Sequence, residues 1–258
     1  MKLARLIGIA MLAILVSIGL LSTVLLPKIE AALLASGGQT SALSVAAMRN
    51  SVPTVVRATP TKAQPMSMVL AQDTFQRADH AFWGVASDGQ MWGADANSLP
   101  GFTTMNHSGR IINGQGAYNA TLGPPSTNAD VVFSGSLSSF HLANLGSVLR
   151  WQDKNDWYKA YRDGTRLLLI KNVNGTMTRL KTSLFAAQAN IFYSLRFRVI
   201  GSQLMARAWP TGKAEPQNWL AMATDNTFTN GFGGLRPFVV KDVNVTITSF
   251  IETSVTNS

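Results

Sequence analysis

The chain has 258 residues, no cysteine, and 22 Lys and Arg against 13 Asp and Glu, for a formal net charge of +9. This length allows one large domain or two small ones, and the absence of cysteine excludes disulfide frameworks, thiolate zinc sites, Cys nucleophiles and lipid anchors on cysteine. Charged residues make up 14% of the chain, well below the ~25% usual for soluble globular proteins, which excludes a disordered polyelectrolyte.

An uncharged, strongly apolar run extends from Leu6 to Pro27, after the positive charges of Lys2 and Arg5. A bilayer core about 30 Å thick is crossed by ~20 helical residues, and the run exceeds the ~7–15 apolar residues of a cleaved signal peptide. The sequence therefore favours a transmembrane helix within residues 1–35, although cleavage there would release a secreted protein. The positive start is expected in the cytoplasm, with the rest of the chain outside the membrane.

Residues 36–65 are rich in Ser, Thr, Ala, Gly and Gln and contain Pro53, Pro60 and Pro65. They show no sustained helical or strand period, so we expect a flexible linker. The composition changes near Met66, which predicts a folded domain over 66–258.

The positive charge is concentrated before this domain. Residues 1–65 contain six Lys and Arg and one Glu, which leaves a net charge of +4 for the remainder. Because there is no dense basic block or basic helix face, the sequence does not indicate a nucleic-acid partner.

From Met66 onward the pattern is that of β-strands joined by tight turns. Asp163-Gly164 and Asn174-Gly175 are typical of type I′ turns, and Gly201-Ser202 is typical of a type II′ turn. The turns predict hairpins that join strands over 157–162, 165–173 and 176–181, and over 192–200 and 203–209.

Alternating residues predict which side of each strand is buried. The expected buried set in strand 192–200 is Tyr193, Leu195, Phe197 and Val199. In a closing strand, one side is lined by Val243, Val245, Ile247, Ser249 and Ile251. Many short strands without helical patterns between them predict an all-β, two-sheet antiparallel jelly-roll sandwich.

Several motifs follow one another in a recognisable order. Asp73-Thr-Phe-Gln-Arg77 precedes Trp83 and Trp92, and the stretch 148–160 is followed by Trp209-Pro-Thr-Gly212 and by Gly231 to Phe250. In this order they resemble concanavalin A-like lectin/glucanase domains, the LamG-like jelly rolls of bacterial surface and secreted proteins. The resemblance spans roughly Val69–Ile251 and implies a β-sandwich that binds carbohydrate or another cell-surface ligand.

The same resemblance makes Asp73 a candidate ligand of Ca²⁺ beside the closing strand. Such domains often carry an acidic pair before the final Phe, where this chain has Thr248-Ser249-Phe250. One carboxylate makes a poor oxygen cage for Ca²⁺. Asp73 is therefore either a calcium ligand or an acceptor of hydrogen bonds at a turn or strand end.

Catalytic members of the family carry a Glu-x-Asp-x-x-Glu pattern, which this chain lacks. Asp153 and Asp156 form the alternative pair, but a spacing of three residues points them to opposite faces of a strand. Turn carboxylates that accept backbone N–H bonds are the favoured interpretation. The histidines His80, His107 and His141 form no zinc motif, so the sequence favours a protein that is not an enzyme.

Aromatic and polar residues gather in one stretch of the predicted sheet. Trp157, Lys159 and Tyr161 share one strand face, opposite Tyr158, Ala160 and Arg162. A sugar ring offers an apolar C–H face and a hydroxyl rim, which suit an aromatic surface flanked by Asp, Asn and Arg, although the rings could instead fill the core. The candidate ligand-binding residues are Arg150, Trp151, Asp153, Asn155, Trp157 and Tyr161.

The sequence thus predicts a non-catalytic binding module for carbohydrate or another cell-surface ligand, held outside a membrane by its N-terminal helix or secreted. Two alternatives remain open: a glycoside hydrolase or lyase with an atypical carboxylate pair, and a structural envelope or adhesion protein. A fold resemblance does not decide among them, because function depends on the site.

Overall fold

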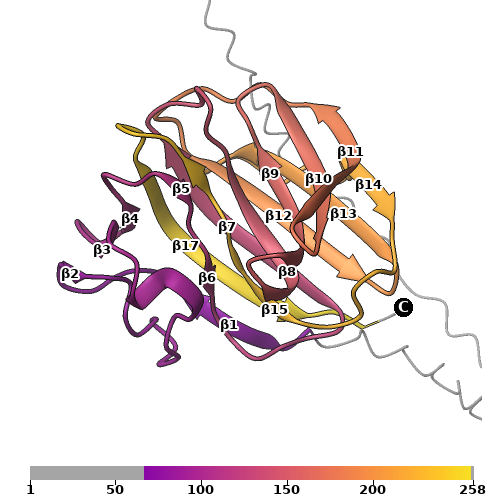
Figure 1. Cartoon of the computed structure of the whole chain (residues 1–258), viewed down its shortest axis with the longest axis horizontal. Helices are drawn as coiled ribbons and strands as arrows, with labels where there is room; N and C mark the ends of the chain where they lie inside the picture. The colour runs from indigo at the N-terminus through magenta and orange to yellow at the C-terminus, as the bar shows by residue number, and fades with distance from the viewer. Residues whose placement is uncertain (1–66, 257–258) are drawn as a thin grey trace, which may run out of the picture. The chain divides into compact units, whose positions relative to one another are not determined.

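The computed structural model describes residues 67–256, and the predicted membrane helix and most of the linker lie outside the described residues. The described part is a β-sandwich with antiparallel strand pairing, as the sequence predicts (Figure 1). Its one helical element is the short 3-10 helix η1 (Ala94–Asn97). Within these residues, no helix is long and apolar enough to span a membrane.

The strands form two large sheets and one small ribbon. The nine-stranded sheet has the order β14 (Ala221–Thr224), β13 (Gln203–Pro210), β12 (Tyr193–Ile200), β7 (Ala129–Leu137), β17 (Val245–Ser254), β4 (Gly109–Ile111), β3 (Phe102–Thr104) and β2 (His80–Ala81), with β1 (Val69–Asp73) also paired to β17. The six-stranded sheet has the order β11 (Thr176–Leu184), β10 (Arg166–Val173), β9 (Asp156–Arg162), β8 (Leu145–Asp153), β15 (Phe232–Leu235) and β6 (Ala120–Thr121). The ribbon pairs β5 (Gly116–Ala117) with β16 (Phe238–Val239).

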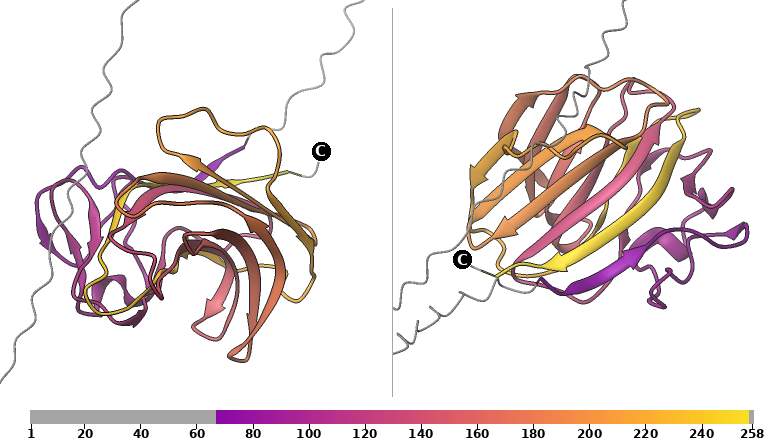
Figure 2. Two further views of the ribbon diagram at one scale, coloured as in Figure 1. Left: turned by 90° about the horizontal axis from the view of Figure 1, so that it is seen from above. Right: turned by 180° about the vertical axis from the view of Figure 1, so that it is seen from behind.

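The main apolar core lies between the two large sheets, which are stacked in Figure 2. The nine-stranded sheet contributes the predicted buried set of β12, namely Tyr193, Leu195, Phe197 and Val199, each at most 6% exposed. The six-stranded sheet contributes Tyr158, Leu167 and Leu169, all fully buried. Burying one such side chain contributes about 1.5–3 kcal/mol, so the alternation along each strand supplies much of the stability.

Two of the three predicted turns are confirmed. Asn174 and Gly175 have φ angles of 51° and 79°, as a type I′ turn requires at both central residues. Gly201 has a φ of 55° between the paired residues Ile200 and Gln203, as expected for a type II′ turn.

The third turn is shifted by one residue from the prediction. Arg162 pairs with Leu167, so Gly164 is the first central residue of the turn and β10 begins one residue later than expected. The carboxylate of Asp163 accepts the backbone N–H groups of Thr165 and Arg166, at 3.1 and 2.9 Å. This side chain stabilises the turn from outside its central positions.

The closing strand β17 follows the predicted alternation only in its first half. Val245 and Ile247 point into the core, but the pairing with β7 is irregular between Ile247 and Ser249. Such a bulge reverses the faces of the residues that follow it. Phe250 and Glu252 are therefore the buried residues, in place of the predicted Ser249 and Ile251.

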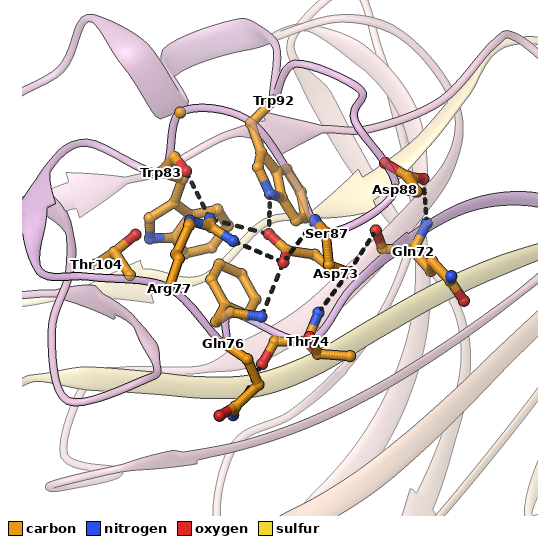
Figure 3. A network of polar contacts seen from close by, with 12 residues as sticks. Gln72, Asp73, Thr74, Gln76, Arg77, Trp83, Ser87, Asp88, Trp92 and Thr104 are labelled. Carbon is orange, nitrogen blue, oxygen red and sulfur yellow. Dashed lines mark hydrogen bonds and ion pairs between the residues drawn. The ribbon is translucent and has the colours of Figure 1, made fainter.

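A polar network anchors the end of β1. The buried carboxylate of Asp73 accepts hydrogen bonds from both terminal nitrogens of Arg77, at 2.7 and 3.0 Å, and from the indole N–H of Trp92 at 2.7 Å (Figure 3). It also accepts the backbone N–H groups of Phe75 and Ser87, at 2.8 and 3.2 Å. Five N–H donors thus surround one carboxylate, and Arg77 supplies its counter-charge inside the protein.

Aromatic rings pack around this network. The ring of Trp83 lies 5.2 Å from that of Phe75 and 4.8 Å from those of Trp92 and Phe102. Trp92 in turn lies 5.2 Å from Phe250 of β17. The first motif of the family resemblance therefore serves to hold β1, β3 and β17 together.

A second buried carboxyl, that of Glu252, crosses from β17 toward the other sheet. Its Oε1 accepts the hydroxyl of Ser126 at 3.1 Å, while Oε2 has no hydrogen-bond partner within residues 67–256. A Cβ atom on Gly233 would lie only 2.0 Å from Oε2, so any other residue at this position would displace the Glu252 carboxyl. Burial raises the pKa of Glu252 to about 8, which makes the neutral acid the stable form at neutral pH.

We expect Asp73→Asn to lower the free energy of unfolding by about 3 kcal/mol, because the change leaves the Arg77 cation in a largely buried place without its counter-charge. Urea unfolding of the full chain in detergent, followed by tryptophan fluorescence, measures the effect. The exposed carboxylate of Asp79 accepts one backbone N–H, so Asp79→Asn is the control and should cost less than about 1 kcal/mol. EDTA should change neither protein, and destabilisation of the wild type by EDTA would contradict a metal-free role for Asp73.

The raised pKa of Glu252 predicts that the free energy of unfolding falls as the pH rises. The folded-state pKa of about 8 lies above the ordinary 4.5, so its stabilising contribution is complete below about pH 4.5 and is lost as the pH approaches 8. The slope is at most ~1.4 kcal/mol per pH unit. We expect Glu252→Gln, which keeps the shape of the neutral acid, to remove this dependence in urea unfolding measured across that interval. Parallel pH profiles for the two proteins would show that Glu252 does not titrate in this way.

Candidate functional site

The face of the six-stranded sheet that points away from the core carries a second apolar cluster. Figure 2 shows this sheet curving strongly, with the larger sheet over its convex side. The buried members of the cluster are Val148, Trp157, Leu168 and Ile170, and the half-buried Trp151 and Tyr161 pack against them. The three aromatic residues predicted to lie together therefore share one cluster, which is separate from the core between the sheets.

Alternation along β9 divides its residues between the two clusters. Tyr158, Ala160 and Arg162 are fully buried on the core side, while Trp157, Lys159 and Tyr161 lie on the opposite face, as predicted. β9 lies between β8 and β10, and its residues are mostly buried on both faces of the sheet.

A hollow of about 250 Å³ lies over this part of the sheet, and we call it the Lys159 hollow. It is lined by Asn144, Trp157, Lys159, Tyr161, Ile170, Met177, Arg236 and Phe238. The lining combines three aromatic rings, two cationic side chains and one amide, and it includes no carboxylate.

A second hollow of about 310 Å³ adjoins the first, and we call it the Asp163 hollow. It is lined by Phe140, Leu142, Ala143, Asn144, Tyr161, Asp163 and Arg166. Asn144 and Tyr161 line both hollows, so the two form neighbouring parts of one surface. In the second hollow Asp163 forms an ion pair with Arg166 at 2.7 Å.

Lys159 is only 3% exposed although it carries an ammonium group. Its Nζ donates to Oδ1 of Asn144 at 2.6 Å and lies 4.7 Å from the ring centre of Tyr161. Burial, together with the charge of Arg236, lowers the pKa of Lys159 well below its ordinary value.

Arg236 covers Trp157. Its guanidinium lies 4.5 Å from the ring centre of Trp157, which is only 1% exposed. Burial lowers the pKa of Arg236, against the opposing charge of Asp95. Trp157 is therefore not the open stacking surface that the sequence suggests, because a cation already occupies the face of its ring.

The other predicted residues of this stretch lie outside both hollows. Trp151 packs at 6.4 Å from the ring of Phe232, and Asp153 and Asn155 are exposed at the tip of the β8–β9 hairpin. Asp153 accepts the N–H of Asn155 at 2.6 Å, and Asp156 accepts that of Asn174 at 2.9 Å. Both carboxylates have the turn role that the sequence favoured over catalysis.

Arg150 is a structural residue in this arrangement. It is 3% exposed and has a φ of 51° at an irregularity in β8. Its guanidinium donates to the carbonyls of Thr127 at 3.0 and 2.8 Å, Gly201 at 2.7 Å and Phe228 at 2.5 Å. These four contacts engage Arg150 inside the fold, in contrast to the predicted ligand contact.

Asp73 likewise belongs to the fold. Its two oxygens accept five N–H groups, so a cation would have to displace Arg77 to reach them. The described residues hold no group of three or more acidic or histidine side chains placed to bind a metal. We therefore assign Asp73 to structural support in place of calcium binding.

Three residues of the Lys159 hollow had no signal in the local sequence pattern. Asn144 and Phe238 come together because their backbones exchange hydrogen bonds of 2.9 and 3.0 Å between segments far apart in the chain. Arg236 arrives next to β8 in the same way, through its N–H bond to the carbonyl of Gly146 at 2.9 Å. Only the sheet order brings these side chains to β9.

No protein-family model matches the chain, and no curated protein sequence matches it. Among solved structures, the xylan β-1,4-xylosidase of Bacillus halodurans C-125 aligns over 76% of this chain at 13% identity and a TM-score of 0.52, and the match spans 41% of the xylosidase. The exoplasmic/lumenal domain of VIP36, in a Ca²⁺/Man2-bound form, aligns over 70% of this chain and 88% of its own at 12% identity and a TM-score of 0.50.

The carbohydrate-binding module CBM66 of Bacillus subtilis aligns over 71% of this chain and 95% of its own, at 14% identity and a TM-score of 0.47. At such low identities, likeness to the xylosidase and to VIP36 establishes the fold alone. The described domain is thus a β-sandwich of the general kind found in carbohydrate-binding and glycoside hydrolase proteins.

Proposed function

We propose that residues 67–256 form a non-catalytic carbohydrate-binding module of concanavalin A-like type, and that the saccharide lies along the Lys159 and Asp163 hollows. The observation that carries this function is the pair of adjoining hollows, which share Asn144 and Tyr161 on the concave side of the six-stranded sheet.

The chemistry of the surface suits a sugar. Phe140, Tyr161 and Phe238 offer apolar ring surface for C–H groups, and Asn144 and Arg166 offer hydrogen bonds for hydroxyl groups. Small-molecule pockets usually measure ~300–1,000 Å³. One hollow is near the lower end of that range, so two neighbouring hollows suit successive units of an oligosaccharide.

Further support comes from the fold. The matched xylosidase is named for xylan, and the matched VIP36 domain is described with bound Man2. A sandwich of this kind therefore occurs in proteins that handle sugars, and the hollows supply the specific argument for this chain.

Binding without hydrolysis is favoured by the acidic groups at the site. Asp163 is the one carboxylate among the residues that line the two hollows, and it is paired with Arg166. Hydrolysis with retention requires two carboxyl groups about 5 Å apart. The enzyme alternative would need a second carboxyl that these linings do not supply.

The location is proposed from the sequence. The apolar run from Leu6 to Pro27 would anchor the chain in a membrane, and residues 36–65 would carry the module away from it. This arrangement would present the concave face to polysaccharide outside the cell, and cleavage of the run would give a secreted module instead.

Binding of the full chain in detergent to a panel of neutral and acidic polysaccharides tests this function, with affinity electrophoresis as the measurement. We expect Tyr161→Ala to weaken the best ligand about tenfold, because Tyr161 serves both hollows and a ring contact with its hydrogen bond contributes about 1–2 kcal/mol.

Trp219→Ala is the matched control, since Trp219 packs under Arg198 and Arg207 of the nine-stranded sheet and should not affect binding. Circular dichroism confirms that both variants are folded. If no polysaccharide is retarded by the wild type, the proposed function is wrong. If the Trp219 variant is the weaker one, the site lies on the other sheet.

A further inference from the structure

Two cations share the Lys159 hollow without a counter-charge. Lys159 and Arg236 both line it, and neither forms an ion pair within residues 67–256. Each lies over an aromatic ring, Lys159 over Tyr161 and Arg236 over Trp157. The ring faces stabilise a cation only partly, by about 0.5–2 kcal/mol.

The nearby carboxylates form no ion pair with Lys159 or Arg236 within residues 67–256. Asp95 attracts Arg236 but does not line the hollow. Asp163, in the adjoining hollow, is paired with Arg166 and also accepts two backbone N–H groups. Among residues 67–256, Lys159 has the amide of Asn144 as its one hydrogen-bond partner.

Several other basic side chains of the domain have carbonyl or carboxylate partners. Arg150 donates to carbonyls that surround its guanidinium, and Arg196 and Arg198 share the carboxylate of Asp130. Arg236 has an Nε without a hydrogen-bond partner in the described part of the chain, as do Arg77, Arg110 and Arg162, and of these four Arg236 lines the Lys159 hollow. Burying charge without such partners is costly, and here an open volume of about 250 Å³ adjoins the charges.

We propose that the ligand of this face carries an oxyanion, a carboxylate or sulfate ester, which is bound by Lys159 and Arg236 in the Lys159 hollow. This inference rests on the proposed function and makes its ligand an acidic saccharide. The anion supplies the counter-charge that the protein lacks at this place, while the rings of Tyr161 and Phe238 contact the sugar.

The residue types fit this assignment. The planar guanidinium of Arg236 matches the geometry of carboxylate and sulfate oxygens, and the ammonium of Lys159 provides a compact second charge. Asn144 accepts from Lys159 and so keeps the ammonium within the lining of the hollow. An anion beside Lys159 favours the charged form of the amine and so opposes the lowering of its pKa by burial and by Arg236.

Isothermal titration of the full chain in detergent compares tetragalacturonate with its methyl ester and with neutral xylotetraose, and a sulfated disaccharide distinguishes sulfate from carboxylate. We expect the acid to bind at least tenfold tighter than its ester at low salt, because a charged hydrogen-bonded contact contributes more than about 1.4 kcal/mol.

Lys159→Met and Arg236→Met each should remove most of this preference, measured as the ratio of the affinity for the acid to the affinity for the ester. Lys213→Met removes one charge from an exposed loop and should keep the preference, which controls for net charge. Equal binding of acid and ester by the wild type overturns the acidic-ligand inference and leaves the carbohydrate function standing. A preference for the acid that persists in both Lys159→Met and Arg236→Met also overturns the acidic-ligand inference and leaves the carbohydrate function standing.

Inorganic sulfate separates the two hypotheses when no saccharide binds. At equal ionic strength, sulfate in place of chloride should raise the unfolding temperature of the wild type more than that of Lys159→Met. If sulfate stabilises the wild type more than Lys159→Met and no saccharide binds, the oxyanion site stands and the carbohydrate function fails. If sulfate stabilises both proteins equally and no saccharide binds, the oxyanion site and the carbohydrate function are both overturned.

Discussion

The structure depends on the alternation of β9 between two buried environments. Tyr158 and Arg162 point into the core between the sheets, and Trp157, Lys159 and Tyr161 point into the cluster on the other face. A slip of one residue would exchange these sets, placing Trp157 and Lys159 in a core that has no room or partner for them. The pairing of β9 with both β8 and β10 prevents such a slip, since both ladders would have to shift together.

This constraint explains why the domain tolerates buried cations of two kinds. Arg162 lies in the core, donates to the carbonyl of Gly135 at 2.6 Å and contacts the rings of Phe133 and Tyr193. Burial lowers its pKa to about 9, so it remains charged at neutral pH. Arg162 is sealed between layers that keep ligands away, whereas Lys159, three residues earlier on the opposite face, borders a hollow. The strand thus places one cation where it supports the fold and another where a ligand can reach it.

The sequence predicts features that depend on residues close together in the chain better than features that depend on distant segments. The faces of β9 and β12 and the turn at Asn174 depend on neighbours in the chain, and they were predicted correctly. The bulge after Ile247 depends on pairing with another strand, and the shifted turn at Asp163 depends on contacts of one side chain. Neither was predicted from the sequence. For the proposed site, the sequence named Trp157 and Tyr161 as candidates, whereas Asn144 and Arg236 reach the same hollow through backbone pairing between distant segments. The same limit applies to Arg150, whose carbonyl partners come from three separate loops.

The cations also change what the aromatic residues can do. An uncovered tryptophan on a concave sheet would favour stacking of a neutral sugar ring, but Arg236 lies over Trp157 and Lys159 lies over Tyr161. A neutral ring that stacked there would have to displace a cation from its aromatic partner and leave it with fewer contacts than before. An acidic sugar reverses this competition, because its anionic group binds the cations while its C–H groups use the remaining ring surface. The features that disfavour stacking of a neutral sugar in the hollow are therefore those on which the proposed acidic ligand depends.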